Sequence, residues 1–176
     1  MRSSLDIRNG RSEDANRLAV LATQVWLHTY ATSGIRATIA EYVLHEFAPE
    51  KYRALLNDPT FQVFVAASGE SLIGLAVVKF DTPCPAGKAS SAELQMLYFQ
   101  EPFLGRGVGK SLLQAAEAEA KRRSNSVLWL AVNAKNASAI AFYARRGYAK
   151  VGTSYFVLGE GRHENHVLIG AVNLPR

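Results

Sequence analysis

Three glycines in the stretch "LGRGVGKSLL" stand at alternate positions, Gly105, Gly107 and Gly109, and Lys110 and Ser111 follow them directly. Glycine has no Cβ, so the backbone amides of such a run can approach a bound anion closely. The next residues have the apolar spacing of a helix, whose N-terminus favours negative charge. The stretch predicts either an anion site or a tight strand-to-helix turn whose glycines serve conformation alone.

Two phosphate-binding templates resemble this stretch, and the sequence fails both. The P-loop pattern G-x-x-x-x-G-K-[ST] requires glycine at position 104, where the chain has leucine. The dinucleotide pattern G-x-G-x-x-G requires glycine at position 110, where the chain has lysine. Because both patterns describe loops of fixed length around a phosphate, the sequence does not support ATP as the ligand.

The composition is that of a globular protein with one sizeable core. The chain has 176 residues, 48% hydrophobic and 20% charged, and we expect a single domain over residues 1–176. One cysteine, Cys84, excludes an internal disulfide and fits a reducing compartment, so we expect the cytoplasm. The start lacks the apolar segment of a signal peptide, and the apolar stretch from Leu72 is too short to span a bilayer. We therefore expect no membrane partner.

The net charge of +5 raises the question of nucleic-acid binding. The densest basic stretches, residues 121–123 and 144–147, stand at the ends of predicted helices, where the helix dipole favours cations. This placement favours solvated helix ends over a nucleic-acid surface, and a phosphorylated cofactor would satisfy the charge equally well.

The four histidines, His28, His45, His163 and His166, lack the spacing of metal ligands, and we expect no metal. The sequence leaves the oligomeric state open, and a homodimer is one state that it allows.

The hydrophobic periodicity predicts an α+β fold with a mixed, mostly antiparallel sheet of about seven strands flanked by about four helices. Predicted helices cover residues 14–30, 38–57 with a break at Pro49, 108–123 and 136–146. Predicted strands lie in "LDIRNG", "FQVFVAAS", "SLIGLAVVKF", "AELQMLYFQ", "VLWLAV", "SYFVL" and "HVLIGAV".

The segments around the glycine turn resemble the GNAT superfamily of acyl-CoA-dependent N-acetyltransferases. The stretch "ELQMLYFQEPFLGRGVGKSLL" is similar to motif A of that family, a strand, a pyrophosphate loop and a helix. The stretch "LWLAVNAKNASAIAFYARRGY" is similar to motif B, with an early asparagine and a late aromatic–tyrosine pair. Leu104 departs from the family loop, where glutamine or arginine is usual, while Gly107 and Gly109 match it.

The resemblance implies acetyl-CoA as cosubstrate and assigns its contacts. Leu97, Tyr98 and Phe99 would pair through their backbone with the pantetheine arm, and the Leu97 amide would stabilise the thioester oxyanion. The turn Gly105–Lys110, with Arg106 and Val108, would hold the pyrophosphate.

Two side chains stand where the family carries proton-transfer groups. Tyr143 matches the position of the acid that protonates the leaving thiolate, although helix packing beside Phe142 would also explain it. Glu93 matches one general-base position, although a strand-end carboxylate in solvent would also explain it. A second base position in the family is Ala131 here, which leaves Glu93 or a water as the base.

Asn136 is predicted to cap the helix that follows it, and the resemblance adds a contact with the cofactor. The acceptor is open between three hypotheses: a small amine such as a polyamine, as in the similar PaiA-type branch; a peptide N-terminus; or no acceptor, in a non-catalytic acyl-CoA sensor. A polyamine would need carboxylates around it, and the candidates are Glu41, Glu46, Glu50 and Glu93.

Overall fold

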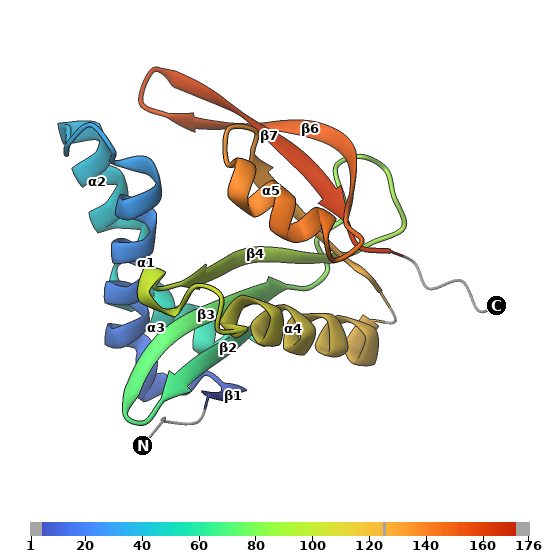
Figure 1. Cartoon of the computed structure of the whole chain (residues 1–176), viewed down its shortest axis with the longest axis horizontal. Helices are drawn as coiled ribbons and strands as arrows, with labels where there is room; N and C mark the ends of the chain where they lie inside the picture. The colour runs from blue at the N-terminus through green and yellow to red at the C-terminus, as the bar shows by residue number, and fades with distance from the viewer. Residues whose placement is uncertain (1–4, 125, 172–176) are drawn as a thin grey trace. The chain divides into compact units, whose positions relative to one another are not determined.

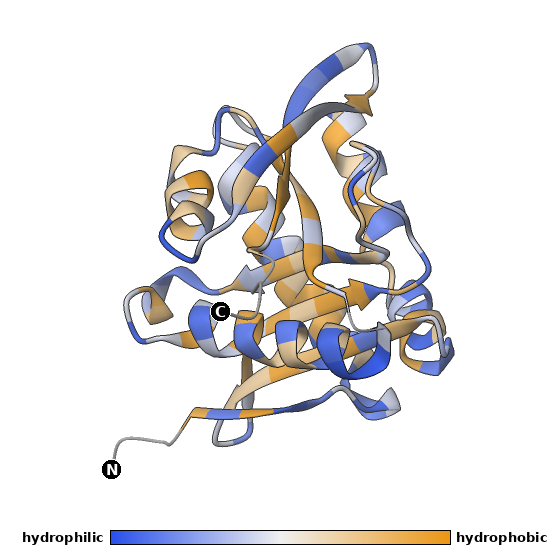
Figure 2. Cartoon of the chain, turned by 90° about the vertical axis from the view of Figure 1, so that its right-hand side faces the viewer, coloured by the Kyte–Doolittle hydropathy of each residue, from blue (hydrophilic) through white to orange (hydrophobic). Residues whose placement is uncertain are grey.

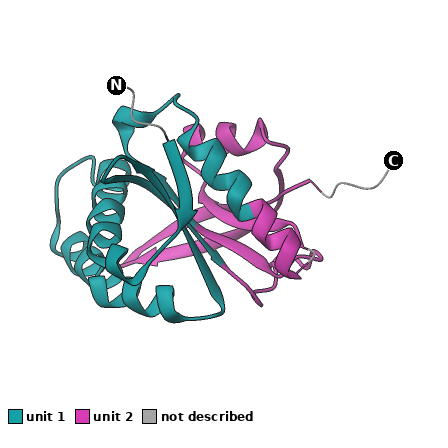
Figure 3. Cartoon of the chain, turned by 90° about the horizontal axis from the view of Figure 1, so that it is seen from below, with its two compact units in different colours: residues 1–78, 96–116 teal, residues 79–95, 117–176 magenta. Residues whose placement is uncertain are grey.

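The structure is a computed structural model that describes residues 5–124 and 126–171 of the chain. The chain divides into two compact units (Figure 3). Unit 1 comprises Met1–Val78 and Met96–Ala116, and unit 2 comprises Lys79–Gln95 and Glu117–Arg176. A single domain over the whole chain stays a prediction.

The described residues form seven strands and five α-helices (Figure 1). The strands are β1 (Leu5–Asn9), β2 (Phe61–Ser68), β3 (Ser71–Lys79), β4 (Ala92–Phe99), β5 (Leu128–Asn133), β6 (Ala149–Leu158) and β7 (Gly161–Ile169). The helices are α1 (Ala15–Tyr30), α2 (Ala37–Glu46), α3 (Pro49–Asn57), α4 (Val108–Ser124) and α5 (Ala137–Ala144). Two short 3₁₀-helices are η1 (Ser12–Asp14) and η2 (Glu101–Phe103).

The strand order is β1-β2-β3-β4-β5-β7-β6. The pairs β1/β2, β5/β7 and β6/β7 are antiparallel, and β4/β5 is parallel. This mixed, mostly antiparallel sheet confirms the predicted α+β fold. The second predicted helical region is two helices, because the chain is extended at Ala48 before proline opens α3.

Unit 1 buries the apolar face that the periodicity of α1 predicts. Leu18, Leu21, Ala22 and Trp26 are buried along that helix. Strands β2 and β3 are buried over most of their length, because both of their faces are covered. Figure 2 shows this contrast, since the long central strands are mainly hydrophobic while the helices carry hydrophilic residues as well.

In unit 2 the final hairpin differs from the sequence prediction. The strand predicted at "HVLIGAV" begins earlier, at Gly161, and the polar residues 162–165 belong to it. Leu158 pairs with Gly161, so a two-residue turn joins β6 to β7. Residues 162–165 are polar and exposed or half-buried, so the sequence there lacks the apolar alternation that predicts a strand.

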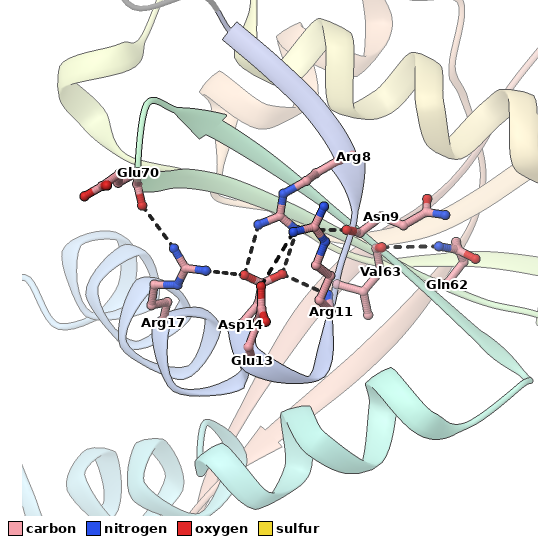
Figure 4. Close-up of polar contacts among 9 residues, drawn as sticks. All are labelled: Arg8, Asn9, Arg11, Glu13, Asp14, Arg17, Gln62, Val63 and Glu70. Atoms are coloured by element: carbon pink, nitrogen blue, oxygen red, sulfur yellow. Dashed lines mark hydrogen bonds and ion pairs between the residues drawn. The ribbon is translucent and has the colours of Figure 1, made fainter.

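One buried carboxylate joins the first elements of unit 1 (Figure 4). The Asp14 side chain has 0% exposure and accepts two hydrogen bonds from the Arg8 guanidinium, at 2.8 and 3.0 Å. It also accepts from the Arg11 amide at 2.8 Å and from Arg17. Arg17 in turn donates to the Glu70 carbonyl in the β2–β3 turn. Asp14 thus ties β1, α1 and that turn together.

These contacts make Asp14 a pH-dependent source of stability. The hydrogen bond from Arg8 holds the pKa of Asp14 below its ordinary value, although burial opposes it. A lowered pKa stabilises the fold above the unfolded-state value of about 3.9, and this stabilisation is lost as the pH falls through the folded-state value.

We predict that Asp14→Asn destabilises the protein by about 3 kcal/mol at neutral pH, because it leaves the buried Arg8 contact uncompensated. Urea unfolding measured from neutral to acid pH checks this, and the two proteins should converge in acid. Glu13→Gln is the control. The Glu13 side chain is 68% exposed, and its ion pair with Arg11 is long, at 3.6 Å, so its loss should cost little stability. Equal losses in both variants at neutral pH would contradict the prediction.

Candidate functional site

The glycine turn of unit 1 adopts a backbone that glycine favours. Gly105 and Gly107 have φ angles of +74° and +82°. A Cβ at either position would meet nothing within 4 Å, so the turn faces open space there. Side chains at these positions would carry backbone strain and would occupy space that is open in this structure.

Helix α4 begins at this turn with unpaired amides. The Ser111 amide donates to the Gly107 carbonyl at 2.9 Å, which is the first hydrogen bond of the helix. Within the described residues, the amides of Val108, Gly109 and Lys110 donate to no acceptor outside the helix, and a helix offers none to its first donors. Three amide hydrogens at a positive helix end can bind an anion.

The side chains around the turn suit a phosphate. Arg106 and Lys110 are exposed, and Arg106 lies over the Phe103 ring at 5.3 Å. Val108 is buried and holds the start of the helix in the core of unit 1. Leu104 is 58% exposed, so its side chain takes no part in the packing of the turn.

A close backbone approach fixes the strand that leads to this turn. A Cβ on Gly74 of β3 would lie 3.0 Å from Phe99 Cβ, 3.1 Å from the Tyr98 carbonyl oxygen and 3.0 Å from Leu112 Cδ1 of α4. The absence of that Cβ therefore lets β3 pack tightly against both β4 and α4. The Gln100 amide donates to the Ile73 carbonyl at 3.0 Å and closes the end of β4.

The predicted pantetheine segment lies in β4, and Leu97, Tyr98 and Phe99 are half-buried there. They belong to unit 1 together with the turn Gly105–Lys110. Unit 1 therefore holds every predicted cofactor residue except Asn136, which belongs to unit 2.

Glu93 lies in the part of β4 that belongs to unit 2, opposite Trp129 of β5. Its carboxylate is half-buried and accepts a hydrogen bond from Gln95 Nε2 at 3.1 Å. Burial raises the pKa of Glu93 above its ordinary value, while Gln95 and the charge of Lys79 oppose that rise. A carboxylate with a raised pKa is a better proton acceptor than an ordinary surface glutamate.

Tyr143 lies near the end of α5 and is 8% exposed. Its ring contacts Phe142 in an edge-to-face arrangement, with centroids 5.2 Å apart, and lies 5.5 Å from the Tyr148 ring. The packing beside Phe142 that the sequence suggested is therefore present, and it is compatible with a role for the hydroxyl.

Asn136 caps α5, as the sequence predicts. Its side-chain oxygen accepts a hydrogen bond from the Ala139 amide at 3.1 Å. Glu93, Tyr143 and Asn136 all belong to unit 2.

Sequence reasoning missed the partners of these residues. Gln95 stands two positions after Glu93 on the same side of the strand, a spacing that could have identified it. The hydrogen bond from Tyr148 to Glu117 joins residues 31 positions apart, and nothing in the local sequence signals it.

The acidic candidates for an amine-binding surface are partly occupied. Glu46 accepts from Lys51 Nζ at 2.9 Å and from His45, and these partners lower its pKa. Glu50 pairs with Arg53 at 3.0 Å. Glu41 is exposed on α2.

The basic stretches lie at helix ends as predicted. Lys121, Arg122 and Arg123 form the last turn of α4, where Arg122 pairs with Glu119 at 2.6 Å and Arg123 lies over the Phe80 ring. Within residues 5–124 and 126–171, no three histidine, cysteine or acidic side chains are grouped as metal ligands would be. In the same ranges, no helix combines the length and the apolar character needed to cross a bilayer.

Known proteins are similar to this chain in sequence and in fold. Spermidine N(1)-acetyltransferase of Thermoplasma acidophilum is 28% identical over 152 residues, which cover 82% of this chain and 88% of that protein. The [ribosomal protein bS18]-alanine N-acetyltransferase of Escherichia coli is 36% identical over 61 residues, which cover 34% of this chain and 41% of that protein.

The crystal structure of PaiA N-acetyltransferase from Thermoplasma acidophilum, solved in complex with coenzyme A, has the same fold. Its TM-score is 0.78 at 23% identity, over 96% of this chain and 99% of that one. The model of the acetyltransferase (GNAT) family matches residues 23–148, which include β4, the glycine turn, Glu93, Asn136 and Tyr143. The chain is therefore an N-acetyltransferase that belongs to the acetyltransferase (GNAT) family.

Proposed function

We propose that this protein transfers the acetyl group of acetyl-CoA to a primary amine of a small molecule, a polyamine such as spermidine, in the cytoplasm. The observation that carries the proposal is the glycine turn, with its open front and the free amides of residues 108–110. The spermidine acetyltransferase relative supports the choice of acceptor, since its likeness covers most of both chains.

Acetyl-CoA supplies an activated thioester, and the turn Gly105–Lys110 holds its diphosphate. The amides donate hydrogen bonds to the phosphate oxygens, and Arg106 and Lys110 add positive charge. Because the backbone amides and these two side chains bind the diphosphate, the site does not need a polar side chain at position 104, where the family has glutamine or arginine and this chain has leucine. The backbone of Leu97, Tyr98 and Phe99 binds the pantetheine arm, and the Leu97 amide stabilises negative charge on the thioester oxygen. Asn136 contacts the cofactor in addition to capping α5.

Glu93 and Tyr143 move the protons. An alkylamine with a pKa of about 10 is mostly protonated at neutral pH and must lose a proton before it attacks. Glu93 accepts that proton, directly or through water. The leaving thiolate, by analogy with cysteine at about 8.5, gains from a proton, which the Tyr143 hydroxyl supplies.

A peptide N-terminus is the second candidate acceptor. The ion pairs of Glu46 and Glu50 favour it, because carboxylates already neutralised by Lys51 and Arg53 attract a polycation less. The bS18-alanine acetyltransferase relative adds support over the third of the chain that it matches.

We predict that the protein releases free thiol from acetyl-CoA with spermidine or a related amine. Tyr143→Phe should lower kcat by about 100-fold and leave the Kd for acetyl-CoA unchanged. A thiol assay over polyamines, monoamines and an alanine-terminated peptide measures thiol release and kcat. Calorimetry measures the Kd for acetyl-CoA. Turnover with the peptide alone would replace the polyamine proposal, and tight binding without turnover on any acceptor would indicate a sensor. Equal kcat in Tyr143→Phe would remove that residue from the acid role.

The raised pKa of Glu93 predicts a pH dependence. As the pH falls through this pKa, Glu93 becomes protonated and can no longer accept the proton of the amine, so kcat/KM should fall. Glu93→Gln should lower kcat/KM by about 100-fold near neutrality and abolish that acid limb. The matched control is Glu119→Gln, since Arg122 lowers the pKa of Glu119 and its charge does not change in this range. An acid limb that survives in Glu93→Gln would assign the base to another group.

Gly107→Val should weaken acetyl-CoA binding by about tenfold or more, because it strains the turn and covers its amides. Calorimetric titration with coenzyme A gives the Kd. Gly87→Val is the matched control: Gly87 has a φ of +68° and open space around its Cβ position, but lies outside the turn. Similar Kd values for both variants would refute the diphosphate site.

A further inference from the structure

We propose that Tyr148, held by Glu117, is a positioning residue that orients the Tyr143 hydroxyl for proton donation. The proposal rests on the function proposed above, in which Tyr143 is the acid. All of its contacts lie within unit 2.

Tyr148 contacts Tyr143 through both ring and backbone. The two ring centroids are 5.5 Å apart with the planes tilted by 58°. The Tyr148 amide donates to the Tyr143 carbonyl at 3.2 Å, and the Arg146 amide donates to the same carbonyl at 2.9 Å. The end of α5 therefore folds back on Tyr143, and one neighbour, Tyr148, limits both the main chain and the ring.

Tyr148 lies between α5 and β6 and is itself fixed by a hydrogen bond to helix α4. Its hydroxyl donates to Glu117 Oε1 of α4 at 2.9 Å, and the residue is 6% exposed. Burial, and then the Glu117 carboxylate, raise the pKa of Tyr148 well above its ordinary value. Tyr148 therefore keeps its proton near neutral pH and donates it in the hydrogen bond to Glu117.

Phe142, the second ring that contacts Tyr143, is also held. The Arg146 guanidinium lies 3.6 Å from the Phe142 ring centroid and donates to the Phe142 carbonyl at 2.8 Å. The Tyr143 ring thus lies against two rings that are each anchored by a charged side chain, Phe142 by Arg146 and Tyr148 by Glu117. The contact with Glu117 depends on the Tyr148 hydroxyl alone, so one substitution, Tyr148→Phe, removes it.

A proton donor must stay within hydrogen-bond reach of the leaving group, and small displacements lower the rate steeply. Loss of the Tyr148 hydroxyl frees the ring that backs Tyr143. The effect on turnover must then pass through the Tyr143 hydroxyl, so a double-mutant cycle can separate positioning from general loss of structure.

We predict that Tyr148→Phe lowers kcat by about tenfold, as expected for one lost hydrogen bond to a charged group, and leaves KM for acetyl-CoA within a factor of about two. In a Tyr143→Phe background the same substitution should leave kcat unchanged. Glu117→Gln keeps an acceptor oxygen and should retain near-normal kcat, whereas Glu117→Ala should match Tyr148→Phe. The measurement is steady-state thiol release with the best amine of the panel.

Tyr52→Phe is the matched control, since Tyr52 is fully buried and its hydroxyl lies 3.6 Å from Met96 Sδ in unit 1. It should leave kcat unchanged. If Tyr143→Phe alone keeps full activity, the proposed acid fails and this inference fails with it. If Tyr143→Phe is slow but Tyr148→Phe has normal kcat, or lowers kcat equally in both backgrounds, only the positioning role is overturned. Should Tyr148→Phe not fold, Glu117→Ala completes the same cycle.

Discussion

The first amides of α4, which have no acceptor among residues 5–124 and 126–171, are the constraint on which the candidate cofactor site of unit 1 depends. A helix cannot satisfy its first donors internally, so residues 108–110 need either water or a ligand. The turn before them needs backbone conformations that glycine adopts without strain, and Gly105 and Gly107 have the positive φ angles that provide them. Buried Val108 and Leu112 hold the helix in place, so that these donors point in fixed directions.

This constraint explains which parts of the site were predictable from sequence. The fixed-length templates failed at Leu104, yet the physical features beneath them, glycines followed by a strong helix, predicted α4 to within one residue at its end. The Asn136 cap was predictable for the same reason, because a cap is a contact between residues three positions apart. Contacts can be predicted from the sequence where the two partners are close together in the chain.

The contacts that sequence reasoning missed are those between distant residues. Tyr148 lies in the connection between α5 and β6, whereas Glu117 lies in α4, and each is an ordinary residue in its own segment. Asp14 is the first residue of the predicted helix 14–30, and that position does not indicate that its carboxylate is buried. Its burial under Arg8 follows only from the pairing of β1 with β2, which brings the strand that carries Arg8 into the sheet. Such partners depend on the tertiary fold and have no period or spacing of their own.

Two neighbouring tyrosines show why the surroundings, and not the residue type, assign the chemistry. Tyr143 and Tyr148 have rings in contact and similar burial, but the Tyr148 hydroxyl is committed to a carboxylate. A phenol that donates to an anion cannot easily lose its proton, because the phenolate would face a like charge in a poorly solvated place. Of the two tyrosines, Tyr148 is therefore excluded from acid catalysis by its own hydrogen bond. The same bond makes Tyr148 a rigid support, which is the role that we propose for it beside Tyr143, the proposed proton donor.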